Sequence, residues 1–475
     1  MDRKINTKAL VRALLIFLLM YVIMTGLAII KYIGAGSFDN ESRRKMLYAC
    51  AAMAISVLLL LVALFTYLVY SRQHLVEKTK SLAALCTAIT LSYVVSISLS
   101  TLQLYYMPVA LVAFVLVPLC ARRDVFVSGV VTNLILSVVL LFEAIFGSVE
   151  TISVVVMLIL GFFLSAIVTY TMSDAPKRMS FTLRGLIVGA VNVGLLYVAS
   201  LIIRSFDFTE VVGYICISSF GQVLVGLMLH PIFEGIFNII TNAKLTELTD
   251  HNSPLMKKLI KEALGTFNHS LEVAGFAEVC AQRIGENPYL ARACAYYHDV
   301  GKTVHPDFFS ENQSGYNPHD ELLPEVSAQI LRAHTVDGYK LCIEHHIPEE
   351  VAEVTLQHHG TLPMAVFYAK AQRLTDSEVD VTDYSYQGKA PVTKIAAIIM
   401  ICDAAEAALR AKGKPTAEQV EEIVTSIIND RIARKQFDNC DITLRDLNTI
   451  KATIIEMYGG VYHGRVQYPT GKVSK

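Results

Sequence analysis

Hydrophobic residues dominate the first half of the chain, where apolar segments of about 20 residues follow one another between short polar stretches. A segment of this length can cross a bilayer as an α-helix. We count eight segments, and the weakest division is the turn from Tyr105 to Pro108. The predicted spans are residues 9–30, 46–70, 82–103, 105–121, 125–147, 151–172, 183–203 and 211–230. Residues 1–230 are therefore predicted to form a polytopic helical membrane domain, one span plus seven.

The pattern changes after residue 230. Phe233, Ile236, Phe237 and Ile240 follow one another at helical spacing and precede a charged stretch, which predicts a juxtamembrane amphipathic linker helix over residues 231–263. From residue 264 to residue 475, helical patterns are separated by proline and glycine, and no convincing alternating strand occurs. The second half is therefore predicted to be an all-α domain.

Composition agrees with this division. Of the 475 residues, 53% are hydrophobic and only 17% are charged, which is too apolar for a wholly soluble protein. The net charge is -1 and no long basic run occurs, so a nucleic-acid polymer is not an expected partner. The nine cysteines include no CxxC pair, which indicates reduced, unpaired thiols instead of a disulfide or zinc framework.

Basic residues beside the spans predict the orientation, because cytoplasmic loops retain lysine and arginine. Eight spans place both termini on one side of the membrane. If that side is the cytoplasm, it holds Arg3, Lys4, Lys8, Arg12, Arg72, Lys78, Lys80, Arg122, Arg123, Lys177, Arg178 and Arg184, whereas the outer loops hold Lys31, Arg43, Arg44, Lys45 and Arg204. We therefore expect a multi-pass protein of the cell membrane with its N terminus and all-α domain in the cytoplasm. The first span is long and lacks a small-residue cleavage site, so we do not interpret it as a cleaved signal peptide.

Polar side chains are few within the spans, and the four worth naming are Asn133, Glu143, Asn192 and Gln222. An intramembrane carboxylate can mark a transport path, but Glu143 lies near a span end, where it can reach the interface. No transporter signature emerges.

Histidine points to chemistry in the second half, since all of the 13 histidines except His74 and His230 follow residue 250. Asn287 and Pro288 predict the start of a helix and Gly301 predicts its end, so His298 and Asp299 should lie in its last turn.

A second helix offers the same arrangement. Pro348 opens it and Gly360 closes it, which places His358 and His359 in its last turn. Helix C-termini carry partial negative charge and favour cations. Two helix ends thus each present an adjacent pair of side chains that can bind a metal.

Asp403 lies in the apolar run Ile395 to Leu409, whose only other charged residue is Glu406. A buried carboxylate is costly unless it meets a cation or a metal. Taken alone, an ion pair with an arginine such as Arg292 or Arg410 accounts for Asp403 better than a metal does.

The candidate ligands combine imidazole and carboxylate without thiolate, which suits Mn, Fe or Zn better than Ca or Mg. Two ions about 3.5 to 4 Å apart form a clamp for in-line phosphoryl displacement. Enough ligands for two sites are present, namely His269, His298, Asp299, His334, His358, His359 and Asp403.

The order of these residues resembles that of the HD-domain hydrolases, and their surroundings are similar to those of the seven-transmembrane receptor HD hydrolase family. The stretches that carry the resemblance are Gly-Thr-Phe-Asn-His-Ser (265–270), Tyr-His-Asp-Val-Gly-Lys (297–302), Glu-Asn-Gln (311–313), Asn-Pro-His-Asp (317–320) and Gln-His-His-Gly-Thr (357–361). It covers residues 230–470 in detail and the span pattern more loosely.

This resemblance implies a ligand set. One metal would be held by His269, His298, Asp299 and Asp403, and the other by Asp299, His334, His358 and His359. Asp299 would bridge the two ions as a catalytic residue. Lys302 is expected to stabilise phosphate charge, with a surface ion pair as the alternative.

The resemblance also implies the function. The expected reaction is metal-dependent phosphodiester hydrolysis of cyclic di-AMP to linear pApA, with two divalent transition-metal ions, Mn or Fe, as cofactors, which would lower the level of a second messenger. Alternatives are an HD phosphohydrolase for another cyclic dinucleotide or nucleotide, or a receptor whose HD domain binds without turnover. The expected partners are the cyclic dinucleotide and the lipid bilayer, and a homodimer is left open.

Three features depart from the family pattern. Only about 15 residues, from Lys31 to Lys45, separate the first span from the second, where the family usually carries a large extracytoplasmic domain. The segment from Tyr384 to Ala390 lacks the usual proline-rich form. Four histidines match no ligand position and are expected to be exposed or to lie behind the ligands; they are His305, His319, His345 and His346.

Overall fold

The computed structural model describes residues 6–34, 40–145, 150–173, 178–202, 207–413 and 415–462. The chain divides into two units, Met1–Ala243 and Lys244–Lys475. Four basic residues of the charge count lie outside the described residues; they are Arg3, Lys4, Lys177 and Arg204. The linker boundaries expected at residues 230 and 263 stay a prediction.

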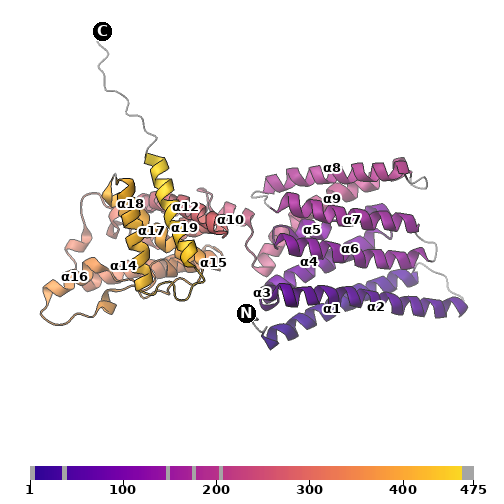
Figure 1. The fold of residues 1–475 in the computed structure, drawn as a ribbon, viewed down its shortest axis with the longest axis horizontal. Coiled ribbons are helices and arrows are strands. Elements are labelled where there is room, and N and C mark those ends of the chain that lie inside the picture. Colours follow the sequence, from indigo (N-terminus) through magenta and orange to yellow (C-terminus); the bar gives the residue numbers. More distant parts are fainter. Residues whose placement is uncertain are drawn as a thin grey trace, which may run out of the picture. The chain divides into compact units, whose positions relative to one another are not determined.

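Long apolar helices that run side by side make up the N-terminal unit (Figure 1). Its helices are α1 (Thr7–Gly34), α2 (Asn40–Ser71), α3 (Gln73–Glu77), α4 (Thr79–Leu99), α5 (Leu111–Leu116), α6 (Arg122–Ala144), α7 (Thr151–Met172), α8 (Arg178–Ile202) and α9 (Phe208–Phe237). In the described part of the chain, seven are long and apolar enough to cross a membrane, namely all except α3 and α5. The polytopic membrane architecture is confirmed.

The predicted span over residues 105–121 differs from the structure, because this segment is not a continuous helix. It forms the short 3₁₀-helix η1 (Leu104–Tyr106) and then α5, with Pro108 between them. Proline has no N–H to continue a hydrogen-bonded turn. Hydropathy alone could not reveal the break, since the run is apolar throughout.

Ion pairs show that the chain between α4 and α6 still passes from one end of the bundle to the other. At one end, the Lys31 ammonium lies 3.0 Å from the carboxylate of Glu143, at the end of α6, and donates to Ser100, just after α4. At the opposite end of α6, Asp124 accepts from Arg72, which follows α2. The broken segment is therefore an eighth passage. The even number of passages agrees with the prediction, although one of the eight predicted helices is not continuous.

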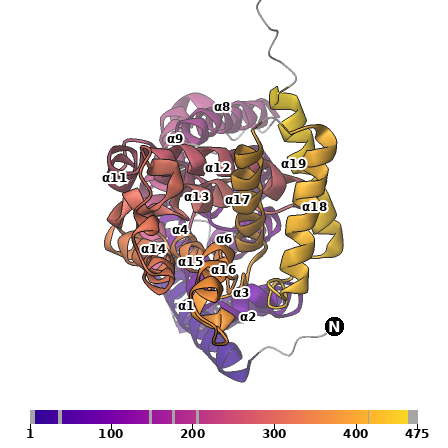
Figure 2. The ribbon, with the colours of Figure 1, turned by 90° about the vertical axis from the view of Figure 1, so that its left-hand side faces the viewer.

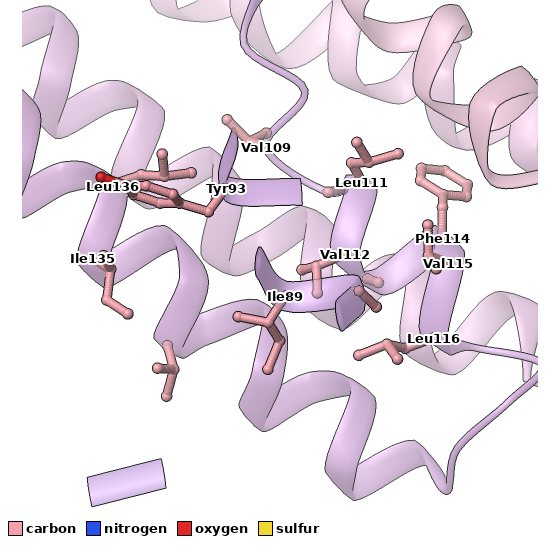
Figure 3. Close-up of a cluster of buried hydrophobic side chains, with 14 of the residues drawn as sticks. Ile89, Tyr93, Val109, Leu111, Val112, Phe114, Val115, Leu116, Ile135 and Leu136 are labelled. Atoms are coloured by element: carbon pink, nitrogen blue, oxygen red, sulfur yellow. The ribbon is translucent and has the colours of Figure 1, made fainter. Parts of the chain in front are cut away.

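The broken passage is surrounded by protein, which non-helical backbone requires at membrane depth. Its side chains from Val109 to Leu116 are buried against Ile89 and Tyr93 of α4 and Ile135 and Leu136 of α6 (Figure 3). Tyr93, the largest of these neighbours, is fully buried and donates its hydroxyl to a backbone carbonyl of α1.

Side chains of α6 and α9 bond to the backbone of this passage. The contacts are Asn133 Nδ2 to Val109 O (2.9 Å), Ser218 Oγ to Met107 O (3.0 Å), Ala110 N to Gln222 Oε1 (3.1 Å) and His230 Nε2 to Phe114 O (2.9 Å). Asn133 and Gln222, two of the four intramembrane polar residues found in the sequence, thus have a structural explanation. Of the other two, Glu143 pairs with Lys31 and Asn192 donates to Ser219.

The expected linker is not one helix. α9 continues without interruption to Phe237, and two short helices follow, α10 (Asn242–Leu248) and α11 (Pro254–Glu262). α11 is strongly two-sided, since Leu255, Met256 and Leu259 are buried, whereas Lys257 is exposed.

The C-terminal unit is all-α, as predicted, and no strand occurs among the residues that the structure describes. After α11 its helices are α12 (Leu264–Ile284), α13 (Pro288–Tyr297), α14 (Pro324–Glu344), α15 (Glu349–Gln357), α16 (Ala365–Leu374), α17 (Lys394–Lys412), α18 (Ala417–Ala433) and α19 (Leu444–Tyr462). Short 3₁₀-helices link them, among them η2 (Val300–Val304), η4 (Ser310–Asn312) and η5 (Pro318–Asp320).

α12 and α17 form the centre of this unit. α12 packs on α13, α17 and α19, and the residues of α17 from Ile395 to Asp403 are buried without interruption. α18 and α19 lie together beside α17 (Figure 2). A helix that is apolar on all sides belongs in a core, which explains why Asp403 within it is enclosed by protein.

Candidate metal centre

The seven candidate ligands converge in one place although five helices supply them. His269 lies on α12, His298 and Asp299 at the end of α13, His334 on α14, His358 and His359 at the end of α15, and Asp403 on α17. His359 is partly buried and the other six are buried. Buried polar groups need partners, so this burial already demands an account of what the side chains bind.

The helix-end positions predicted from the sequence are confirmed. The Asn287 side chain caps α13 by accepting from the backbone N–H of Tyr289, and His298 is the C-cap of the same helix. His358 is likewise the C-cap of α15. These residues therefore lie where unpaired carbonyl groups favour positive charge.

Gly301 does not end the helix as the sequence suggested, because α13 ends at Tyr297 and Gly301 lies within η2. A Cβ atom on Gly301 would lie only 1.9 Å from the carbonyl oxygen of His334 on α14. Glycine is required here by the close approach of two backbones, and this approach brings His334 near Asp299.

His269, His298, Asp299 and Asp403 form the first group, and their ligand atoms all lie within 4.8 Å of one another. His269 Nε2 lies 3.0 Å from Asp403 Oδ1, and His298 Nε2 lies 3.3 Å from Asp299 Oδ2. The arginine pairing considered for Asp403 is not found, since Arg410 instead contacts Glu406.

Asp299, His334, His358 and His359 form the second group, again within 4.8 Å. Asp299 Oδ1 lies 3.3 Å from His334 Nε2 and 3.4 Å from His358 Nε2. Since Oδ2 of the same carboxylate faces His298, Asp299 presents one oxygen to each group. This is the arrangement that a bridging carboxylate needs.

Three histidine rings are held in the orientation that a metal ligand would need. The Nδ1 atoms of His298, His334 and His358 each face a backbone carbonyl of the preceding helical turn, which fixes the proton on Nδ1. The Nε2 lone pairs then point inward, and those of His334 and His358 face each other at 3.3 Å. Two lone pairs this close repel unless a cation lies between them.

Unpaired atoms support the same interpretation. His298 Nε2 and Asp299 Oδ1 are buried and have no hydrogen-bond partner among the described residues. Imidazole and carboxylate donors without thiolate suit divalent transition metals. The residues present thus fit a metal cation at each group.

Electrostatics adds to this fit. Burial lowers the pKa of His358 and of His359, so both rings are neutral and keep a lone pair. Burial by itself lowers the pKa of His298 as well, but Asp299 and Asp403 outweigh it and raise this pKa to about 10. The carboxylates of the first group therefore favour positive charge at the position that a metal would take.

Lys302 lies inside the site and not on the surface. Its ammonium is 2.7 Å from Asp299 Oδ2 and 2.8 Å from Glu311 Oε1, and its side chain is only 12% exposed. Burial by itself raises the pKa of Asp299, but the Lys302 ammonium and the His298 ring hold it well below its usual value. The ion pair considered for Lys302 exists, but it is buried.

Glu311 reaches Lys302 because its loop packs closely on α12. A Cβ atom on Gly265 would lie 1.9 Å from the Glu311 carbonyl oxygen, so glycine permits this approach. Thr266 then donates its hydroxyl to Glu311, and its N–H donates to Asn312. Residues 265–270 and 311–313, which appeared separately in the sequence, thus form one contact.

Glu406 lies behind His269. Its carboxylate bonds His269 Nδ1, the ring nitrogen opposite the one that faces Asp403, and it also pairs with Arg410. A carboxylate on the far nitrogen of a ligand histidine fixes the ring orientation and raises its basicity. The charge of Glu406 is evident in the sequence but this role is not, although its spacing from Asp403 places both residues on one helix face.

Four of the candidate ligands line a cavity of about 860 Å³ in the C-terminal unit, namely His269, His334, His359 and Asp403. Its wall includes Tyr386, whose ring stacks on His359 with centroids 4.3 Å apart. Burial raises the pKa of Tyr386, so its hydroxyl stays protonated. In the sequence, the segment from Tyr384 to Ala390 was notable only because it lacks the proline-rich form. Tyr386 was therefore not predicted to belong to the site.

The four unmatched histidines contribute no ligand atom to either group. His305, His345 and His346 are exposed. His319 is buried, and it contacts Phe308 and Phe367 at the cavity wall.

Comparison with known proteins identifies the family. Residues 266–408 match the HD domain family. The chain is 42% identical over 306 residues to the cyclic-di-AMP phosphodiesterase PgpH of Listeria monocytogenes, covering 63% of this chain and 42% of that protein. It is 32% identical over 432 residues to PgpH of Bacillus subtilis, covering 87% of this chain and 60% of that protein.

A solved structure is also similar in sequence. The crystal structure of the L. monocytogenes PgpH HD domain in complex with cyclic-di-AMP is 46% identical, with a TM-score of 0.44, and the match covers 45% of this chain and all of that one. The chain spans 42% and 60% of the two curated relatives' lengths. From the HD match and the two PgpH relatives, one of them aligned through most of the membrane unit, the chain belongs to the PgpH family of HD-domain proteins.

Proposed function

We propose that this chain is a membrane-bound, metal-dependent phosphodiesterase that opens cyclic di-AMP to linear pApA and so lowers the level of this second messenger. The observation that carries the proposal is the pair of ligand groups that share Asp299 and border a cavity of about 860 Å³. Both curated relatives are named cyclic-di-AMP phosphodiesterases, which supports the choice of substrate.

Two divalent ions, with Mn or Fe as the proposed metals, would be held by the groups already described. His269, His298 and Asp403 would complete one site, His334, His358 and His359 the other, and Asp299 would belong to both. When bound, such ions supply positive charge that activates water and neutralises phosphoryl oxygens.

The side chains of the protein prepare this centre. Lys302 neutralises the buried Asp299 and holds its carboxylate between the two groups, with Glu311 fixing the ammonium from the other side. Because Lys302 also lines the cavity, its charge acts on a phosphate bound there. Glu406 orients His269 in the same way from α17.

We also infer that the C-terminal unit faces the cytoplasm together with the N terminus. Basic residues gather at the end of the bundle where α2 ends and α6 begins; among those described are Arg72, Lys78, Lys80, Arg122 and Arg123. Positive residues favour the cytoplasmic side. Since the described part of the membrane unit makes eight passages, the start of α1 and the end of α9 lie on that side. A homodimer stays a prediction.

Turnover by the purified full chain in detergent with Mn²⁺ tests the function. We expect cyclic di-AMP to yield pApA, and Asp299→Asn or His298→Ala to lower kcat on the order of 100-fold or more, since metal charge contributes several kcal/mol to phosphoryl transfer. His345→Ala changes an exposed histidine outside both groups and should retain activity.

A panel of cyclic dinucleotides and mononucleotides in the same assay defines the substrate. Faster turnover of another member would contradict the assignment to cyclic di-AMP. Full activity of a correctly folded Asp299→Asn protein, checked by circular dichroism, would contradict the metal centre itself. No turnover of any panel member by the metal-loaded chain would favour a receptor that binds without hydrolysis.

A further inference from the structure

The cavity extends beyond the metal centre along one face of α17. Asp403, Ala407 and Arg410 line it, and Ala411 continues the same wall. These positions follow one another at helical spacing, and from Asp403 to Arg410 the helix rises about 10 Å. Because alanine side chains are small, the wall leaves an open path from the candidate ligands to the arginine.

A second arginine, Arg431 on α18, lines the same cavity. Its side chain is only 17% exposed, which is low for a guanidinium. One of its terminal nitrogens pairs with the neighbouring Asp430, whereas the other terminal nitrogen and the buried Nε have no hydrogen-bond partner among the described residues. Arg431 therefore retains donors for an anion.

The other cations of the cavity wall are more fully engaged. Lys302 is held between the carboxylates of Asp299 and Glu311. Arg410 pairs with Glu406 and lies 3.8 Å from a carboxylate oxygen of Glu272. Among the cations lining the cavity, Arg431 thus combines low exposure with a single carboxylate partner.

A cyclic dinucleotide needs a second anion site. Its two phosphodiesters lie on opposite sides of one ribose–phosphate ring, so when one is at the metal centre the other is held at a distance from it. A buried phosphate is costly without a cation, and arginine is well suited to bind phosphate oxygens.

We propose that Arg431, assisted by Arg410, binds the second phosphate of the substrate, the one that is not being cleaved. This inference rests on the proposed function and deepens it, because it explains how the chain selects a ligand with two phosphates over one with a single phosphodiester. Arg431 acts on binding and not on the chemical step, which takes place at the other phosphate.

Arg431→Ala in the full chain tests the proposal, with Arg434→Ala as the matched control. Arg434 lies one turn along from Asp430, contacts the same carboxylate at 2.8 Å, is 47% exposed and does not line the cavity. Arg410 is unsuitable as a first test because it also contacts Glu406, which orients His269.

A comparison of two ligands distinguishes the contribution of the second phosphate to binding from that of the bases. Cyclic di-AMP carries two phosphodiesters, whereas the linear dinucleotide ApA has the same two bases and a single phosphodiester. We expect Arg431→Ala to raise the KM for cyclic di-AMP about tenfold with kcat changed less than about twofold, as loss of a charge-assisted hydrogen bond predicts. The inhibition constant of ApA should stay unchanged, and Arg431→Lys should restore part of the affinity.

Two outcomes would overturn the subsite. One is that Arg431→Ala and Arg434→Ala behave alike; the other is that cyclic di-AMP and ApA lose affinity equally, in which case Arg431 only shapes the cavity. Failure of the proposed function is distinguishable, since the wild-type chain would then show no turnover of cyclic di-AMP. In that case, dissociation constants from calorimetry for the wild type, Arg431→Ala and Arg434→Ala still test the subsite.

Discussion

Carboxylates at two levels organise the candidate metal centre. Asp299 lies between the two groups and directs one oxygen to each. Glu406 lies outside the ligand groups and bonds Nδ1 of His269, the ring nitrogen that faces away from Asp403. Arg410 neutralises Glu406 in turn. Ring orientation in the first group thus depends on a residue that contributes no ligand atom.

Glu406→Gln should weaken metal binding at the first group. The amide loses the negative charge that raises the basicity of His269, so we expect affinity for Mn²⁺ at one of two sites to fall about 10- to 100-fold while the other site is unchanged. Metal content by mass spectrometry and calorimetric titration measure this directly, without any substrate.

Glu278→Gln is the control for this variant. Glu278 also pairs with an arginine, Arg292, at 2.7 Å, but it contributes to neither ligand group. Equal metal affinities for the two variants and the wild type would show that Glu406 does not tune the site.

At residue scale the sequence predicted well where spacing along one helix end determines position. His298, Asp299, His358 and His359 lie at helix ends as expected. Burial and spacing alone could not show that Asp403 faces histidines and not an arginine, because that depends on how α17 packs against other helices; only the family resemblance implied it. The close approach that requires Gly301 is equally invisible before the fold is known.

At the scale of elements, the passage between α4 and α6 is the feature that the hydrophobic pattern could not resolve. Its residues are as apolar as those of a continuous helix, yet η1 and α5 are short. The hydrogen bonds that satisfy the backbone at the break come from distant parts of the chain, since Asn133 lies on α6 and Gln222 on α9. The polar residues were visible in the sequence, but their partners were not.

Gln222→Leu should destabilise the membrane unit. Leucine has a similar size but leaves the N–H of Ala110 without its acceptor, so we expect a loss of about 1 kcal/mol in stability. The melting temperature of the detergent-solubilised chain should fall by several degrees. Thr171→Val serves as the control, because Thr171 is exposed and its hydroxyl bonds only within α7; an equal fall for both variants would contradict the role of Gln222.

At the scale of the whole molecule, eight passages connect the sequence pattern to the orientation. The sequence predicted the even number from eight helices, whereas the described residues reach it with seven long helices and one broken passage. The parity depends on two pairs of contacts, Lys31 with Glu143 at one end of the bundle and Arg72 with Asp124 at the other. Hydropathy could count segments, but only these contacts show that the broken one crosses.

Labelling of single introduced cysteines in intact cells tests both the parity and the orientation. The nine native cysteines are buried or partly buried, so the wild-type chain gives the background. Cysteine is placed at three exposed positions, Lys78 before α4, Glu150 before α7 and His345 after α14, and is treated with a membrane-impermeant maleimide.

Three passages, α4, the broken segment and α6, separate Lys78 from Glu150, and three more, α7 to α9, separate Glu150 from His345. Glu150→Cys should therefore react in intact cells, whereas Lys78→Cys and His345→Cys should react only after permeabilisation. If Lys78→Cys and Glu150→Cys reacted alike, the broken segment would return to the side from which it started, because only two passages would then lie between them. If all three reactivities were reversed, the parity would hold but the C-terminal unit would face outward, away from a cytoplasmic nucleotide.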